Sequence, residues 1–210
     1  MTIKNNTEAD ICFYKKEYKQ AFGLYEKNKD YYAMGLCSLL LNDKNNAKKF
    51  WLKSKNSCPA SQWGLCVLNY IDLKDKGLPT FFQTRAHLEV YLNLFIENGY
   101  IEWAQNLISF CDKLYTANPE SYKFISRALF SNGYFEMAIT FCRKSLRIFY
   151  TDPEAFLILS QCYFLLGNLG EALDCVNRSE NIVNDYFPVK LFKSIILEEI
   201  KKKNEKKDKF

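Results

Sequence analysis

The sequence predicts an all-α protein, a solenoid of antiparallel helix–turn–helix repeats, and three observations predict that class. The phrases NGYIEWA, NGYFEMA and LGNLGEA begin at residues 98, 132 and 166, so one pattern recurs every 34 residues. Apolar residues between these phrases follow the spacing of one helix face. Pro119 and Pro153, also 34 residues apart, each follow a residue suited to cap a helix, Asn118 and Asp152. A period of this length indicates a stack of similar helical units.

The first helix of each repeat is predicted by its apolar spacing. Tyr122, Ile125, Ser126 and Leu129 lie at i, i+3, i+4 and i+7, which places them on one helix face. The same positions recur 34 residues earlier and later, at Leu88, Tyr91, Leu92 and Phe95, and at Phe156, Leu159, Ser160 and Tyr163. We therefore expect three first helices that bury equivalent faces.

A glycine turn and a second helix complete each repeat. Gly133 is expected to end the first helix, because glycine tolerates the left-handed backbone that closes a helix C-terminus. A second helix is predicted over about residues 135–149. Its inner face carries the small side chains of Ala138 and Ser145, which let a neighbouring helix approach closely. Each repeat is thus a helical hairpin that covers its apolar face by stacking on its neighbours.

The repeat resembles a known family. The pattern W-x2-L-G-x2-Y…A-x3-F…P is that of the tetratricopeptide repeat, and residues 85–184 are similar to three consecutive copies of it. Aromatic residues or Leu replace the Trp, and Leu or Ser replaces the Gly beside it. The resemblance implies a right-handed α-solenoid whose first helices line a concave groove. It places the regular repeats at residues 85–118, 119–152 and 153–186.

The remainder of the chain extends the array at both ends into a single domain over residues 1–202. Irregular repeats are expected over about residues 6–84, with the same signature at Gly35 and Trp51 and a further first helix around Trp63 and Gly64. Residues 77–84 form either a truncated helix or the start of a long helix from Thr80 to Glu97; the sequence leaves both open.

An amphipathic capping helix is predicted over about residues 187–202, as helical arrays require at their ends. Its apolar face is Phe192, Ile195, Ile196 and Ile200, and its polar face is Lys190, Lys193, Glu198 and Glu199. The basic tail at residues 203–210 is expected to be disordered and to aid solubility.

Charge and hydropathy exclude several classes of protein. The 210 residues are 48% hydrophobic and carry a formal charge of +5, most of it in the final segment KKKNEKKDKF. A nucleic-acid-binding body would be more basic, so a nucleic acid partner is disfavoured. No stretch is apolar over the length of a membrane span, and no signal peptide is visible. We expect a soluble cytoplasmic protein, and the pattern makes no prediction of its oligomeric state.

No set of catalytic residues is found, so we expect that the protein is not an enzyme. His87 is its only histidine, which we interpret as an ordinary helix residue. The eight cysteines form no C-x-x-C pair and are interpreted as reduced, structural thiols. No nucleotide-binding glycine loop or metal-binding motif occurs. No metal and no small-molecule cofactor are therefore expected.

The candidate binding surface is the free face of the three first helices, which the family resemblance places in the groove. Asn93, Arg127 and Gln161 form a polar ladder at 34-residue spacing that can hydrogen-bond the backbone of an extended peptide. Phe130, Phe164 and Leu157 offer apolar pockets. The complete candidate set is Glu89, Asn93, Ile96, Lys123, Arg127, Phe130, Leu157, Gln161 and Phe164. The alternative is a solvated helix face without a ligand.

These observations favour a non-catalytic scaffold that binds a peptide or helix of a partner protein in the concave groove. Two alternatives stay open. The first is a dedicated chaperone or secretion-system adaptor, which small proteins built only from such repeats resemble. The second is an RNA-binding α-solenoid, which the nearly neutral body disfavours.

Overall fold

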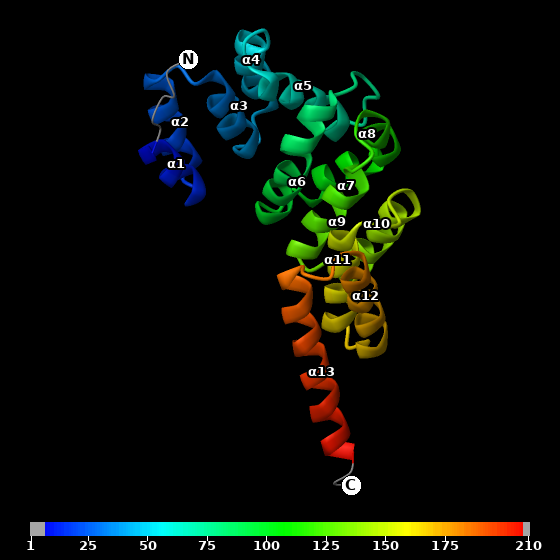
Figure 1. The fold of residues 1–210 in the computed structure, drawn as a ribbon. Coiled ribbons are helices and arrows are strands. Elements are labelled where there is room, and N and C mark those ends of the chain that lie inside the picture. The colour runs from blue at the N-terminus through cyan, green and yellow to red at the C-terminus, as the bar shows by residue number, and fades with distance from the viewer. Residues whose placement is uncertain (1–6, 208–210) are drawn as a thin grey trace. The chain divides into compact units, whose positions relative to one another are not determined.

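The computed structural model describes residues 7–207 and, within them, side chains from residue 8 to residue 205. All regular elements in this range are helices, which confirms the expected all-α class (Figure 1). They are α1 Thr7–Tyr14, α2 Tyr18–Lys27, α3 Tyr31–Leu40, α4 Lys44–Ser54, α5 Pro59–Ile71, α6 Phe81–Glu97, α7 Ile101–Ser109, α8 Cys111–Ala117, α9 Ser121–Ser131, α10 Phe135–Ile148, α11 Pro153–Leu165, α12 Leu169–Ile182 and α13 Phe187–Lys207. None of these helices has both the length and the apolarity to cross a membrane.

The chain forms two compact units. The first unit comprises the residues up to His87 together with residues 94–118, and the second comprises residues 88–93 together with the chain from Pro119 onward. Helix α6 therefore contributes to both units, its middle to the second and its ends to the first. The expected organisation as a single domain stays a prediction.

Helical hairpins build the second unit, as the repeat predicts. Helix α9 packs against α10, and α11 packs against α12 (Figure 1). Gly133 closes α9 with a φ of 81°, in the left-handed region expected from the sequence. The small residues Ala138, Ser145, Ala172 and Ser179 of the second helices are fully buried, so the helices approach closely at these positions.

Helix α13 caps the second unit through a cluster that differs in part from the predicted one. Val189 and Ile196 are fully buried against Ala172 and Val176 of α12 and Leu157 of α11, with Phe192 and Ile200 packed at the edge. Ile195, predicted on this face, is instead 42% exposed. The residue at 195 lies about 100° around the helix from Ile196, so the two cannot share a narrow buried stripe.

The capping helix is longer than expected. It continues to Lys207, whereas the sequence predicts that it ends near residue 202 and that residues 203–210 form a disordered tail. That assignment is wrong for residues 203–207, and residues 208–210 lie outside the described range. Ion pairs one turn apart, Lys202 with Glu198 and Lys201 with Glu205, support the additional turn.

In the first unit, one tryptophan joins three helices. Trp51 of α4 is fully buried, and its ring nitrogen donates a hydrogen bond to the backbone oxygen of Tyr32, 3.1 Å away. Its ring lies against Gly35 of α3 on one side and Gly64 of α5 on the other. A Cβ atom added to Gly64 would lie 2.7 Å from ring atoms of Trp51, so the absence of a side chain is what allows these helices to meet.

The structure also decides between the two alternatives for residues 77–84. Helix α6 begins at Phe81 behind a capping box, in which Thr80 accepts from the backbone of Gln83 and the Gln83 side chain accepts from the backbone of Thr80. The long helix is therefore confirmed, and residues 72–80 link it to α5 without a companion helix. Instead α5 contacts α7, where the side chain of Asn106 donates to the backbone oxygen of Ile71.

Candidate functional site

Buried charges connect the first helices of the second unit. Lys123 of α9 is only 8% exposed, and its ammonium group lies 2.8 Å from a carboxylate oxygen of Asp152. The same group lies 3.1 Å from Glu120 and 3.4 Å from Glu154. Asp152 also caps α11, as its sequence position predicts, by accepting from the backbone nitrogens of Glu154 and Ala155. Lys123 therefore ties α9 to the start of α11.

Arg127, one turn further along α9, bridges the two neighbouring first helices. Its Nε donates to Glu89 of α6 over 2.8 Å, and its Nη1 donates to Glu154 of α11 over 2.7 Å. Its Nη2 also contacts Glu89. The guanidinium carbon lies 5.5 Å from the centre of the Phe124 ring. We call Glu89, Glu120, Lys123, Arg127, Asp152 and Glu154 the first-helix network.

The first-helix network keeps its two cations charged and leaves an excess of negative charge. Burial lowers the pKa of Lys123, but the carboxylates of Asp152, Glu120 and Glu154 outweigh it and raise that pKa above its usual value. Burial likewise opposes the charged form of Arg127, and hydrogen bonds to Glu89 and Glu154 raise its pKa overall. Two cations thus face four carboxylates. A ligand that carries positive charge would relieve the repulsion among them.

The polar ladder predicted from the sequence is only partly available. Arg127 already donates hydrogen bonds to the carboxylates of Glu89 and Glu154, and Asn93 accepts a hydrogen bond from the side chain of Asn132 over 2.8 Å. Gln161 is half-buried, and its side chain makes no hydrogen bond within the described part of the chain. Gln161 is therefore the ladder residue whose amide is available to a ligand.

Three predicted groove residues do not lie on a free face. Lys123 is buried in the network described above. Leu157 is 7% exposed and belongs to the core beneath α13, and Phe164 packs at the edge of that core with its ring 5.4 Å from the ring of Phe192. All three were predicted from their repeat positions to face a ligand. Stacking uses this side of each first helix for the next helix in the array, so α11 and α13 cover Lys123 and Leu157, and Phe164 is half-buried.

The other two apolar candidates are half-buried. Phe130 lies beside the turn of its own hairpin, with its ring 5.9 Å from that of Phe135. Ile96 belongs to the first unit, whereas the remaining candidate residues belong to the second. Of the predicted set, the second unit therefore brings together Glu89 and Arg127 directly, with Lys123 joined to them through Glu154.

Asp152 and Glu154 were not among the site residues predicted from the sequence. Asp152 was interpreted only as a helix cap, and Glu154 lies outside the candidate set. A signal for both was present, because Lys123 and Arg127 lie one turn apart on α9 and two carboxylates lie two residues apart at the start of α11. Opposite charges on stacked first helices could have predicted the pairing.

The single histidine and the buried thiols lie in apolar surroundings. His87 packs near the rings of Tyr32 and Trp63, at 6.3 and 6.1 Å between ring centres, and burial lowers its pKa. Burial raises the pKa of Cys142 and of Cys162 to about 12. These two thiols are therefore neutral near pH 7 and poor nucleophiles. Within residues 7–207, no group of three or more His, Cys, Asp or Glu side chains is placed to hold a metal ion.

One protein-family model matches part of this sequence. The family model described as anaphase-promoting complex, cyclosome, subunit 3, which is of the tetratricopeptide type, matches residues 104–179. That range is less than half of the chain and runs from α7 into α12. The tetratricopeptide-type repeats identified from the sequence are confirmed. The comparison with curated proteins found no match.

The solved structures that match this chain share little sequence with it. YrrB, a TPR protein with an unusual peptide-binding site, is 13% identical, with 89% of this chain and 88% of that chain covered and a TM-score of 0.44. The C-terminal part of a TPR repeat-containing protein from Cytophaga hutchinsonii is 18% identical, with 91% and 70% covered and a TM-score of 0.47. The TPR2AB domain of yeast Sti1 in its pHSP90 complex is 13% identical, with 90% and 81% covered and a TM-score of 0.40. Likeness at this level says nothing of what this chain binds.

Proposed function

We propose that the protein is a non-catalytic interaction scaffold that binds a peptide or helix of a partner protein across the first helices of its second unit. The observation that carries the proposal is the first-helix network, which holds half-exposed polar groups of α6, α9 and α11 in one fixed arrangement. Side chains that are already ordered lose little entropy on binding, so such a surface is suited to recognition.

The charge of the network indicates the kind of segment that this surface recognises. Four carboxylates surround two cations, and Glu154 is the most exposed of the network side chains, at 38%. The free amide of Gln161 lies two turns further along the same helix, α11. We therefore infer a segment that presents Lys or Arg to Glu154 and Glu89 and a backbone group to Gln161.

The proposed binding residues are Glu89, Asn93, Arg127, Glu154 and Gln161, with Phe130 at the edge. Lys123 acts by positioning Glu154 and Asp152 rather than by contact with the partner. The proposed compartment is the cytoplasm, whose reducing conditions suit a chain in which the eight cysteines are thiols.

The test is affinity capture from lysate of the native cell, followed by titration of each enriched protein after purification. The wild-type chain is compared with Glu154→Gln/Gln161→Ala, which removes one negative charge and one amide but leaves Arg127 paired with Glu89. The proposal expects the variant to lose about tenfold or more in affinity for a partner that the wild type enriches.

A matched control keeps the test specific. Glu136→Gln/Thr140→Ala removes one negative charge and one polar group from exposed positions of α10, and it should leave the affinity unchanged. Equal affinity of the wild type and Glu154→Gln/Gln161→Ala for each enriched partner would overturn the proposal. Circular dichroism of each variant establishes that the helices are intact.

A further inference from the structure

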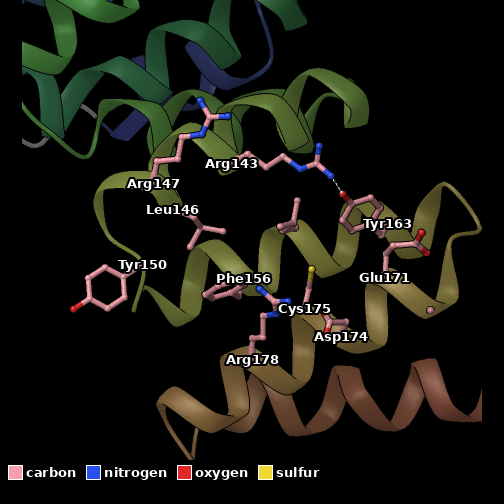
Figure 2. A pocket seen from close by; sticks show the side chains of 12 residues that line it. Arg143, Leu146, Arg147, Tyr150, Phe156, Tyr163, Glu171, Asp174, Cys175 and Arg178 are labelled. Carbon is pink, nitrogen blue, oxygen red and sulfur yellow. Dashed lines mark hydrogen bonds and ion pairs between the residues drawn. The ribbon is translucent and has the colours of Figure 1, made fainter.

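A second surface of the same unit forms an open hollow of about 920 Å³ between the second helices α10 and α12, with α11 behind them (Figure 2). None of the residues that line it belongs to the first-helix network. A hollow of this size is comparable to the sites that proteins use for ligands. It is therefore a candidate site independent of the function proposed above.

The inner wall of the hollow is apolar. Leu146 of α10, Phe156 and Leu159 of α11 and Cys175 of α12 converge there, and Leu159 and Cys175 are 6% and 7% exposed. Burial raises the pKa of Cys175 to about 11, so its thiol is a neutral, apolar contact near pH 7. An apolar side chain from a ligand would lose its water against this wall, which is the usual energetic basis of an anchor residue.

One rim of the hollow is basic. Arg143 and Arg147 extend from exposed positions on successive turns of α10, and Figure 2 shows both guanidinium groups on the α10 side of the hollow. Arg143 donates a hydrogen bond to the hydroxyl group of Tyr163, which lies at one end. Neither arginine forms an ion pair with a carboxylate within residues 7–207. Both charges therefore remain available to an anionic ligand.

The opposite rim is closer to neutral. Asp174 of α12 forms an ion pair with Arg178 over 3.0 Å, and Glu171 lies near the Tyr163 end of the hollow. The charges across the hollow are therefore asymmetric, with positive charge on α10 and a paired, mixed rim on α12. A ligand with carboxylates on one side of an apolar group would match this asymmetry.

We propose that the hollow between α10 and α12 docks an acidic peptide segment of a partner protein. The segment would place one large apolar side chain among Leu146, Phe156 and Leu159 and its carboxylates against Arg143 and Arg147. A nucleic acid fits less well. The wall is a recess of aliphatic and aromatic side chains rather than a row of exposed rings for stacking, and the basic rim consists of only two arginines.

The test measures fluorescence anisotropy of labelled peptides titrated with the full chain. The probe is a short peptide with one Trp flanked by several Glu on each side. One comparison peptide has Ala in place of Trp, and another has Lys in place of each Glu. The proposal expects the acidic Trp peptide to bind about tenfold more tightly than either comparison peptide, because both the anchor and the charges contribute.

Two pairs of protein variants separate charge from shape. Arg143→Glu/Arg147→Glu should lower the affinity for the acidic Trp peptide about tenfold or more. Lys201→Glu/Lys203→Glu makes the same change in charge on α13 and should leave this affinity unchanged. Gly170→Phe places a ring at the edge of the hollow, where an added Cβ meets no atom within 4 Å, and circular dichroism of this variant establishes that its helices are intact. In Gly170→Phe, the acidic Trp peptide should bind no more tightly than the peptide with Ala in place of Trp. In Gly170→Ala, the Trp peptide should still bind more tightly.

Three results would overturn the proposal. The first is equal affinity of the acidic Trp peptide for the wild type and Arg143→Glu/Arg147→Glu. The second is an equal loss in Lys201→Glu/Lys203→Glu, which would assign binding to the C-terminal lysines. The third is tighter binding of a short single-stranded RNA with the same dependence on Arg143 and Arg147. Glu154→Gln/Gln161→Ala should leave peptide affinity unchanged, so failure here is distinguishable from failure of the function proposed above.

Discussion

The hairpins of residues 7–71 and the regular repeats that follow make the same kind of turn with different residues. Gly99, Gly133 and Gly167 close the first helices of the regular repeats with φ values of 78°, 81° and 80°. At Lys16, Lys29 and Asn42 the backbone is also left-handed, with φ values of 63°, 54° and 62°, but the residue is not glycine. The turn geometry is therefore common to both regions, and it is visible in the sequence only where glycine occupies the position.

The two regions also differ in how their helices pack. The first unit inserts the large ring of Trp51 between two glycines, whereas the second unit has the smaller side chains of Cys142 and Val176 at the equivalent positions of its second helices. Close helix contact requires little volume on one side, and either solution supplies it. In the first unit, a side chain at Gly35 or Gly64 would overlap the ring of Trp51, whereas in the second unit several smaller side chains share the contact.

The largest effect is expected at the tryptophan contact. Gly64→Ala should lower the free energy of unfolding by about 3 kcal/mol, because the new methyl group overlaps a ring that Gly35 confines from the other side. Chemical denaturation monitored by tryptophan fluorescence measures this change. Gly23→Ala, where an added Cβ meets no atom within 4 Å, is the matched control and should be neutral or stabilising. Equal stability of Gly64→Ala and wild type would show that Trp51 can move.

The buried lysine in the second unit should have the next largest effect. Lys123→Met leaves Asp152, Glu120 and Glu154 without their shared cation and should cost about 2 kcal/mol near pH 7. Lys190→Met, which removes an exposed ion pair with Asp185, should cost much less, because water screens an exposed pair. Urea titrations of both variants test the comparison, and equal costs would contradict it.

The contribution of Lys123 should also depend on pH in one direction. Its pKa is higher in the folded chain than the usual value of 10.5. The stabilisation is therefore complete below pH 10.5 and is lost as the pH rises through the folded-state pKa. The difference in unfolding free energy between wild type and Lys123→Met should stay constant between pH 7 and 10 and decrease above 10.5. A decrease below that range would contradict the assignment.

A smaller effect should distinguish two serines at equivalent repeat positions. The hydroxyl of Ser179 donates to the backbone oxygen of Pro153 over 2.7 Å, whereas the buried hydroxyl of Ser145 has no hydrogen-bond partner among the described residues. Ser179→Ala should cost about 1 kcal/mol, and Ser145→Ala should be neutral or stabilising. Thermal unfolding of the two variants provides the measurement. The reverse order would contradict the hydrogen bonding described here.

Effects of this size or smaller are expected at the turns. Leu73→Gly should stabilise the chain by about 0.5–1 kcal/mol, because Leu73 is 61% exposed and holds a left-handed backbone that favours glycine. Gly133→Ala, the reverse exchange in a regular repeat, should destabilise it by about 1 kcal/mol. Melting temperatures of both variants measure the pair. A loss of stability in Leu73→Gly would show that its side chain contributes more through packing than its backbone costs.

The sequence determined the features that depend on neighbours within a helix or turn. The 34-residue period predicted the regular hairpins, Gly133 predicted their turn, and Asp152 predicted the start of α11. These predictions succeed because backbone conformation and caps depend on residues within about one helical turn. The same local reasoning could have predicted that a long helix begins after Thr80, since Thr80 and Gln83 have the spacing of a capping box.

Only the tertiary structure decided which faces of the helices remain free. Period and spacing place Lys123, Leu157 and Gln161 on one side of their helices, but they do not say which part of that side the next helix covers. Packing of α13 buried Leu157, ion pairs engaged Lys123, and Gln161 alone kept an available side chain. The hollow between α10 and α12 likewise depends on the spacing of two helices more than twenty residues apart. Such contacts depend on shape and charge across the stack, which local sequence does not encode.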